Sequence, residues 1–131
     1  MFETTFAPAL APLDTATLRE PDPLREAGAY SALVREIGED GAAEVRAVFW
    51  DDTSARLELF RTLALAQHRA KIGREAHSLK STAKTFGYVR LATLALQLET
   101  TADTVGEAAY YDLLARMDAA FAAARALEAQ D

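Results

Sequence analysis

The sequence has 131 residues, half of them hydrophobic and about a quarter charged, with a net charge of -6 and no cysteine. This length suits a single domain, and the composition excludes a disordered chain, a disulfide scaffold and a thiolate metal site. No apolar run approaches the roughly 20 residues of a membrane-spanning helix, and Glu3 stands where a signal peptide carries positive charge. We therefore expect one cytoplasmic domain without a membrane segment.

Charge is unevenly distributed along the chain. Residues 61–90 contain seven basic residues and one acidic residue, so the rest of the chain is strongly acidic. An acidic body repels nucleic acid and anionic membranes, and we expect neither as a partner. The basic segment suits an acidic protein surface or a phosphoryl group, although a solvated helix face also explains it.

The first 22 residues are rich in proline and lack a clear apolar period. We predict a loosely ordered arm over residues 1–22, with a short helix from about Thr15 as the alternative. The domain itself is expected over residues 23–131.

Apolar residues at spacings of three and four predict helices on both sides of Gly38. The first ends with Ile37 as a core contact, and the second is capped near Asp40. Residues 51–53 offer N-cap side chains, so the next segment either follows a bend near Asp51 or continues the same helix. The residues expected to face the core are Tyr30, Leu33, Val34, Ile37, Ala42, Val45, Val48, Phe49, Leu57, Phe60, Leu63 and Ala64.

Glycines and a capping motif divide the second half of the chain. Gly73 marks a break, Gly87 is a C-cap candidate, and Thr104 with Glu107 fits a capping box that begins the last helix. No strand pattern occurs, which predicts an all-α, antiparallel four-helix bundle that needs no second copy. Its expected core residues are Ala76, Leu79, Ala83, Phe86, Leu91, Leu94, Ala95, Leu98, Tyr110, Leu113, Leu114, Met117, Phe121, Ala124 and Leu127.

His77 is the most informative polar residue. At 100° per residue it shares a stripe with Lys80, Ser81 and Lys84, beside the stripe that faces the core. His77 is therefore expected at the exposed edge of the core, with two ammonium groups one and two turns further on. This arrangement suits an anion on the imidazole ring.

Glu99 is the second candidate site residue. His77 precedes Gly87 by ten residues and Glu99 follows it by twelve, which places them about 15 and 18 Å from the turn in an antiparallel helix pair. A carboxylate that accepts the Nδ1 hydrogen would leave Nε2 as the nucleophile. From spacing alone, a surface histidine and an unrelated glutamate at a helix end explain the pattern equally well.

Other chemistries find little support. His68 is interpreted as an exposed surface residue, and its nine-residue separation from His77 disfavours a zinc site. The hydroxyls near His77 lack a nucleophile elbow, and the isolated glycines form no ATP-binding loop. We expect no metal, no cofactor and no enzyme activity of the chain's own.

Residues 76–87, Ala-His-Ser-Leu-Lys-Ser-Thr-Ala-Lys-Thr-Phe-Gly, closely resemble the phosphoacceptor helix of histidine-containing phosphotransfer (HPt) domains, including those of chemotaxis kinases. A leucine-rich continuation ends in Glu99, and the resemblance spans about residues 33–121. It implies that His77 is phosphorylated on Nε2, that Lys80 contacts the phosphoryl group and that Glu99 holds Nδ1. Lys84 is a further candidate contact from the shared stripe, and Ser81 replaces the family's usual glycine, which predicts altered docking rather than its loss.

The resemblance implies a phosphorelay carrier that moves a phosphoryl group between a sensor kinase or receiver domain and the aspartate of a response regulator. The receiver would supply Mg²⁺, and the carrier would act as a monomer. A kinase dimerisation domain is disfavoured, because Ser78 and Thr82 stand where that family has an acid and a proline. A helical adaptor that docks a receiver or kinase domain without phosphorylation is the remaining alternative.

Overall fold

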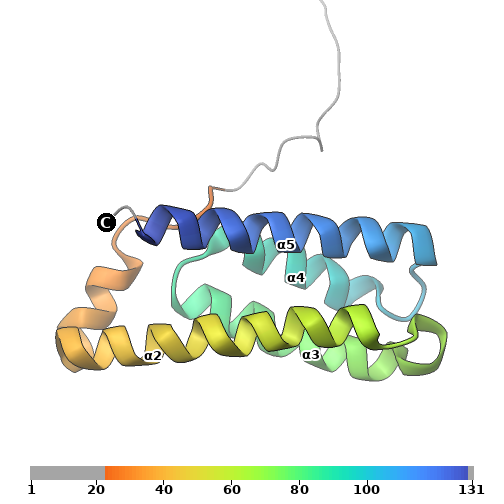
Figure 1. Cartoon of the computed structure of the whole chain (residues 1–131), viewed down its shortest axis with the longest axis horizontal. Coiled ribbons are helices and arrows are strands. Elements are labelled where there is room, and N and C mark those ends of the chain that lie inside the picture. The colour runs from red at the N-terminus through yellow and green to blue at the C-terminus, as the bar shows by residue number, and fades with distance from the viewer. Residues whose placement is uncertain (1–22, 130–131) are drawn as a thin grey trace, which may run out of the picture.

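The computed structural model describes residues 23–129, which form four helices and no strand. The helices are α2 (Ala29–Thr62), α3 (Leu65–Thr85), α4 (Val89–Thr101) and α5 (Glu107–Ala129). Successive helices reverse direction along the long axis of the molecule (Figure 1), so the predicted all-α antiparallel bundle is confirmed. The predicted arm over residues 1–22, with its alternative helix from Thr15, lies outside the described residues. None of the described helices is both long and apolar enough to cross a membrane.

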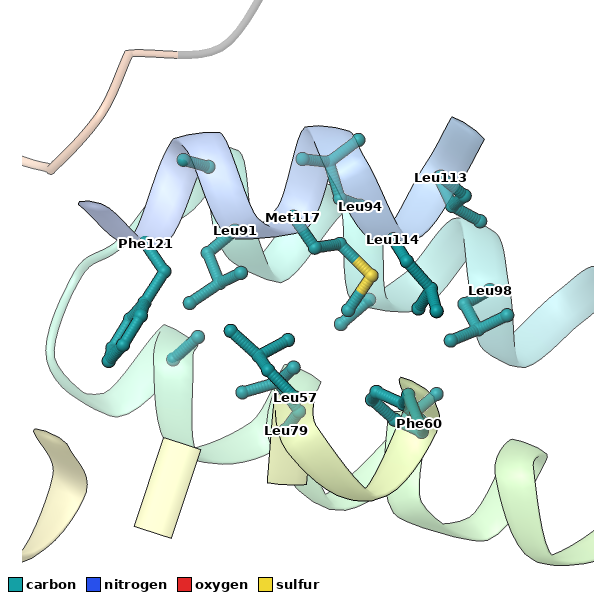
Figure 2. Packing of buried hydrophobic residues seen from close by; sticks show 14 of the residues in the cluster. Leu57, Phe60, Leu79, Leu91, Leu94, Leu98, Leu113, Leu114, Met117 and Phe121 are labelled. Atoms are coloured by element: carbon teal, nitrogen blue, oxygen red, sulfur yellow. The ribbon is translucent and has the colours of Figure 1, made fainter. Parts of the chain in front are cut away.

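One hydrophobic core lies between the four helices (Figure 2). The predicted core residues of α3, α4 and α5 are buried, except Leu127, which is half-buried. Each helix contributes an apolar stripe at spacings of three and four residues, which is how an amphipathic helix covers a core. The side chains labelled in Figure 2 are Leu57 and Phe60 from α2, Leu79 from α3, Leu91, Leu94 and Leu98 from α4, and Leu113, Leu114, Met117 and Phe121 from α5.

Helix α2 is kinked at Gly38, whose φ of 85° and ψ of 164° are not helical. The predicted break at this glycine is therefore confirmed. The prediction that Ile37 is a core contact is wrong, because its side chain is 47% exposed. The part of α2 before the kink turns away from the long axis (Figure 1), and Leu33 is the residue there that packs against the core.

Beyond Gly38, α2 continues without a bend to Thr62, and its buried face differs from the predicted one. Val45 and Val48 are 40% and 54% exposed, whereas Ala42 and Phe49 are buried as expected. The buried stripe continues through Thr53 in mid-helix, which excludes an N-cap role for residues 51–53. Ala64, another predicted core residue, is exposed in the connection between α2 and α3.

Thr53 is fully buried, and its hydroxyl has no hydrogen-bond partner among the described residues. Because an unsatisfied buried hydroxyl is costly, we expect Thr53→Val to raise the free energy of unfolding by about 1 kcal/mol. Urea unfolding monitored by circular dichroism measures this change. Thr53→Ser, which keeps the hydroxyl and loses the methyl group, is expected to be less stable than the wild type; a Val variant no more stable than wild type would contradict the prediction.

Helix α3 runs through Gly73, so the predicted break at this glycine is wrong. A Cβ placed on Gly73 would lie 3.5 Å from the Cβ of Ala102, at the end of α4. The small residues therefore allow α3 and α4 to pack closely while α3 stays helical. The local irregularity occurs instead at His68, with φ of -132°, and this residue is half-buried rather than exposed.

Gly87 ends α3 as predicted and sets the turn into α4. Its φ is 78°, its N–H donates to the Lys84 carbonyl (3.0 Å), and the Tyr88 N–H donates to the Ala83 carbonyl (2.9 Å). These two bonds form a Schellman motif, which satisfies carbonyls at the helix end. The Gly87 carbonyl also accepts from the Glu26 N–H at 2.6 Å, so the segment before α2 is attached to this turn.

The last helix begins at Glu107, with the Gly106 carbonyl accepting from the Tyr110 N–H (2.9 Å). The start therefore lies two residues later than a cap at Thr104 would place it. Gly106 has no side chain to cap the helix. The first turn is instead stabilised by Glu107, an acid near the positive end of the helix dipole.

Candidate functional site

His77 lies on the outer face of α3, with 59% of its side chain exposed. The preceding residue, Ala76, is fully buried, so His77 stands at the margin of the core. Its Nδ1 is 2.8 Å from Oε2 of Glu99 on α4. The two side chains thus meet across the helix pair, as their distances from Gly87 predict.

The Glu99 carboxylate fixes the tautomer of His77. An ionised carboxylate only accepts hydrogen bonds, so the proton lies on Nδ1 and the lone pair lies on Nε2. Nε2 therefore points away from Glu99, and most of the His77 side chain is exposed. In this arrangement the ring can present an oriented lone pair at Nε2.

Lys80 contacts the second oxygen of the same carboxylate. Its Nζ lies 3.0 Å from Oε1 of Glu99, and the two side chains are 21% and 27% exposed. Hydrogen bonding from Lys80, and then from His77, lowers the pKa of Glu99 below its ordinary value. Glu99 therefore stays ionised at neutral pH and contacts both His77 and Lys80.

The α3–α4 turn explains why these residues meet. Leu79, two residues after His77, and Leu98, next to Glu99, are both fully buried, so the core fixes the rotation of each helix (Figure 2). The Schellman motif at Gly87 fixes their relative height. The site is thus held by packed helices rather than by a loop, which favours a precise geometry.

Lys84 and Ser81 are exposed on α3, and no contact among the described residues joins either side chain to His77 or Glu99. Lys84 instead lines, with Lys80, a hollow of about 250 Å³ towards the α3–α4 turn. Leu96, which is 43% exposed, contributes to its largely apolar wall. We call this the apolar hollow; its lining residues are Glu26, Lys80, Lys84, Gly87, Val89, Ala92, Thr93 and Leu96.

A second hollow of about 530 Å³ lies on the other side of His77, and the sequence analysis did not identify it. Arg69 is fixed at its base, because Nη1 donates to the carbonyls of Ala102 (3.0 Å) and Val105 (2.8 Å). The position of Arg74 three residues before His77 was the available signal. We call this the basic hollow; its lining residues are Arg69, Ala70, Gly73, Arg74, His77, Ser78, Glu99, Ala102 and Asp103.

Metal ligands do not gather in the part of the chain that the structure describes. Among residues 23–129 there is no group of three or more histidine, cysteine, aspartate or glutamate side chains placed to hold an ion. His68 lies in the first turns of α3, away from the lining of both hollows. Among these residues, Glu99 is the side chain that contacts the His77 ring.

Comparison with known protein families identifies a match. The model of the family described as Hpt domain matches residues 44–127, which is more than half of the chain and includes His77, Lys80 and Glu99. No curated protein and no solved structure matches the chain.

Proposed function

The chain belongs to the Hpt domain family, whose members are phosphorelay carriers rather than catalysts and interact with two-component kinases and receivers, and we propose that His77 is its phosphoacceptor. The observation that carries the proposal is the 2.8 Å contact between Nδ1 of His77 and Glu99. It leaves Nε2 as an oriented, exposed nucleophile.

The transfer step needs no proton movement at the ring. The Nε2 lone pair attacks the phosphorus of a receiver's aspartyl phosphate, a P–N bond forms, and the P–O bond breaks with its electron pair leaving on the aspartate carboxylate. The ring keeps its Nδ1 hydrogen and becomes cationic, and Glu99 stabilises that charge. The reverse sequence returns the phosphoryl group to an aspartate.

Lys80 and Lys84 of α3 have different roles in this proposal. Lys80 contacts the carboxylate that also holds His77, and we assign it to neutralise the phosphoryl group. Lys84 is a turn further along the helix, in the apolar hollow, where it suits contact with the acidic surface of a receiver. The receiver supplies the acceptor aspartate and its Mg²⁺, so the carrier needs no cofactor.

The partners proposed are the receiver domain of a response regulator and a sensor histidine kinase. The apolar hollow and exposed Leu96 adjoin the basic side chains around His77, which suits a contact with an apolar centre and a charged margin. Ser81, four residues after His77, lies at this surface and is small enough to permit a close approach. Such a contact must be transient, because a carrier has to release each partner.

The test is to map the label on the wild-type chain. We expect incubation with a radiolabelled, phosphorylated receiver domain to give an acid-labile, base-stable label, and peptide mapping to place it on His77. His68, on the same helix, is the internal comparison. Label on His68, or no label with a broad panel of receivers and kinases, would overturn the proposal in favour of an adaptor that docks without being phosphorylated.

A further inference from the structure

We propose that Arg74 is a second cation for the phosphoryl group on His77, binding it in the basic hollow. The inference rests on the proposed function, since it concerns the phosphorylated form. Arg74 and His77 line the same hollow of about 530 Å³, on the side of the ring away from the apolar hollow. No hydrogen bond or ion pair with another described residue holds the Arg74 guanidinium.

Helix geometry places the ring on this side. Side chains on an α-helix lean towards its N-terminus, so the His77 imidazole extends over the turn that contains Gly73 and Arg74. Gly73 and Ala70 leave that part of the hollow open, because neither has a side chain beyond Cβ. A phosphoryl group on Nε2 therefore has room beside Arg74.

The charges of the phosphorylated site do not balance without one more cation. In the phosphorylated form, the cationic ring and Lys80 face the Glu99 carboxylate and a phosphoryl group with a charge of about -2. One negative charge remains uncompensated. Arg74 supplies the matching positive charge and a planar fork of N–H donors that fits phosphoryl oxygens.

The other charged residues nearby are less suitable. Arg69 lines the same hollow, but its Nη1 donates to two backbone carbonyls, which holds the guanidinium at the end of α4. Lys84 lies two helical turns from His77, in the apolar hollow. Asp103 also lines the basic hollow, yet no contact between described residues joins it to Arg74.

The experiment compares the full-length wild type with Arg74→Gln, Arg74→Lys and Lys71→Gln, each phosphorylated with phosphoramidate. Lys71 is an exposed cation of α3 outside the basic hollow, so its variant controls for the loss of one positive charge. Phosphorus NMR identifies the Nε2-phosphohistidine and follows the titration of its phosphoryl oxygens with pH. Circular dichroism checks that each variant is folded.

Arg74→Gln is expected to raise the proton affinity of the phosphoryl group roughly two- to fivefold, as for loss of one exposed ion pair, and the effect should shrink in high salt. Arg74→Lys should recover most of the wild-type value, and Lys71→Gln should match the wild type. Equal titrations for Arg74→Gln and wild type would overturn the role of Arg74 and leave the proposed function intact. A wild-type chain with no phosphohistidine signal at His77 would overturn both.

Discussion

Replacing His77 by glutamine is expected to abolish phosphoryl transfer while leaving the fold intact. Glutamine keeps a polar side chain of similar reach but has no ring nitrogen to form a P–N bond. Since 59% of the His77 side chain is exposed and no core contact depends on it, the midpoint of urea unfolding should change little. Transfer from a radiolabelled, phosphorylated receiver, followed by gel analysis, measures the loss.

His68→Gln is the matched control for this experiment. It removes the other histidine of α3, which lies outside both hollows, and is expected to retain the full rate of transfer. If His77→Gln carried as much label as the wild type, the phosphoacceptor would be another residue. An adaptor that only docks its partners would show no label in any variant and an unchanged affinity for the receiver.

The contact between His77 and Glu99 could be predicted from the sequence because it depends on few quantities. Gly87 defines the turn, the helical rise fixes the height of each residue, and buried neighbours fix the rotation of each helix. The structure has each of these features, with Gly87 at a φ of 78° and the two side chains 2.8 Å apart. Spacing alone did not distinguish this pair from a surface histidine and an unrelated glutamate, and the 2.8 Å contact does.

The buried face of α2 was harder to predict, because the sequence offers two apolar stripes. Val45 and Val48 form one and Ala42 and Phe49 the other, and periodicity does not rank them. The choice depends on packing: the buried stripe continues through Thr53, a polar residue that the sequence suggested as a cap. The sequence of one helix does not say which of its two apolar faces the neighbouring helices cover.

The break predicted at Gly73 was wrong, and the basic hollow was not predicted, for a related reason. A glycine within a helical pattern predicts a break, because glycine has a low helix propensity. Here Gly73 lies against Ala102, and the close packing of α3 and α4 outweighs that low propensity. The close approach of the two helices also brings the end of α4 beside Arg69 and Arg74. These residues belong to the site only once the two helices are placed side by side.

Glu99→Gln is expected to slow phosphoryl transfer about 10- to 100-fold, by analogy with the loss of carboxylates that orient metal-bound histidines. The neutral amide still accepts from Nδ1, but it stabilises the cationic ring less and releases Lys80 from its ion pair. Glu99→Ala, which also loses the acceptor, should be slower still. Single-turnover transfer rates to a receiver measure both variants.

Glu75→Gln is the matched control, since Glu75 is a carboxylate of α3 that pairs with Arg56 at 2.9 Å and does not contact His77. Its transfer rate should equal that of the wild type. If Glu99→Gln also kept the wild-type rate, the carboxylate would have no part in orienting the ring.

The pKa of Glu99 adds a test that depends on pH. Because Lys80 and His77 lower this pKa in the folded state, the stability that the carboxylate contributes is fully present above its ordinary pKa of 4.5 and is lost as the pH falls through the lower folded value. The difference in unfolding midpoint between wild type and Glu99→Gln should therefore be present at neutral pH and shrink as the pH falls below 4.5. A difference that does not change with pH would mean that Glu99 acts through packing rather than through its charge.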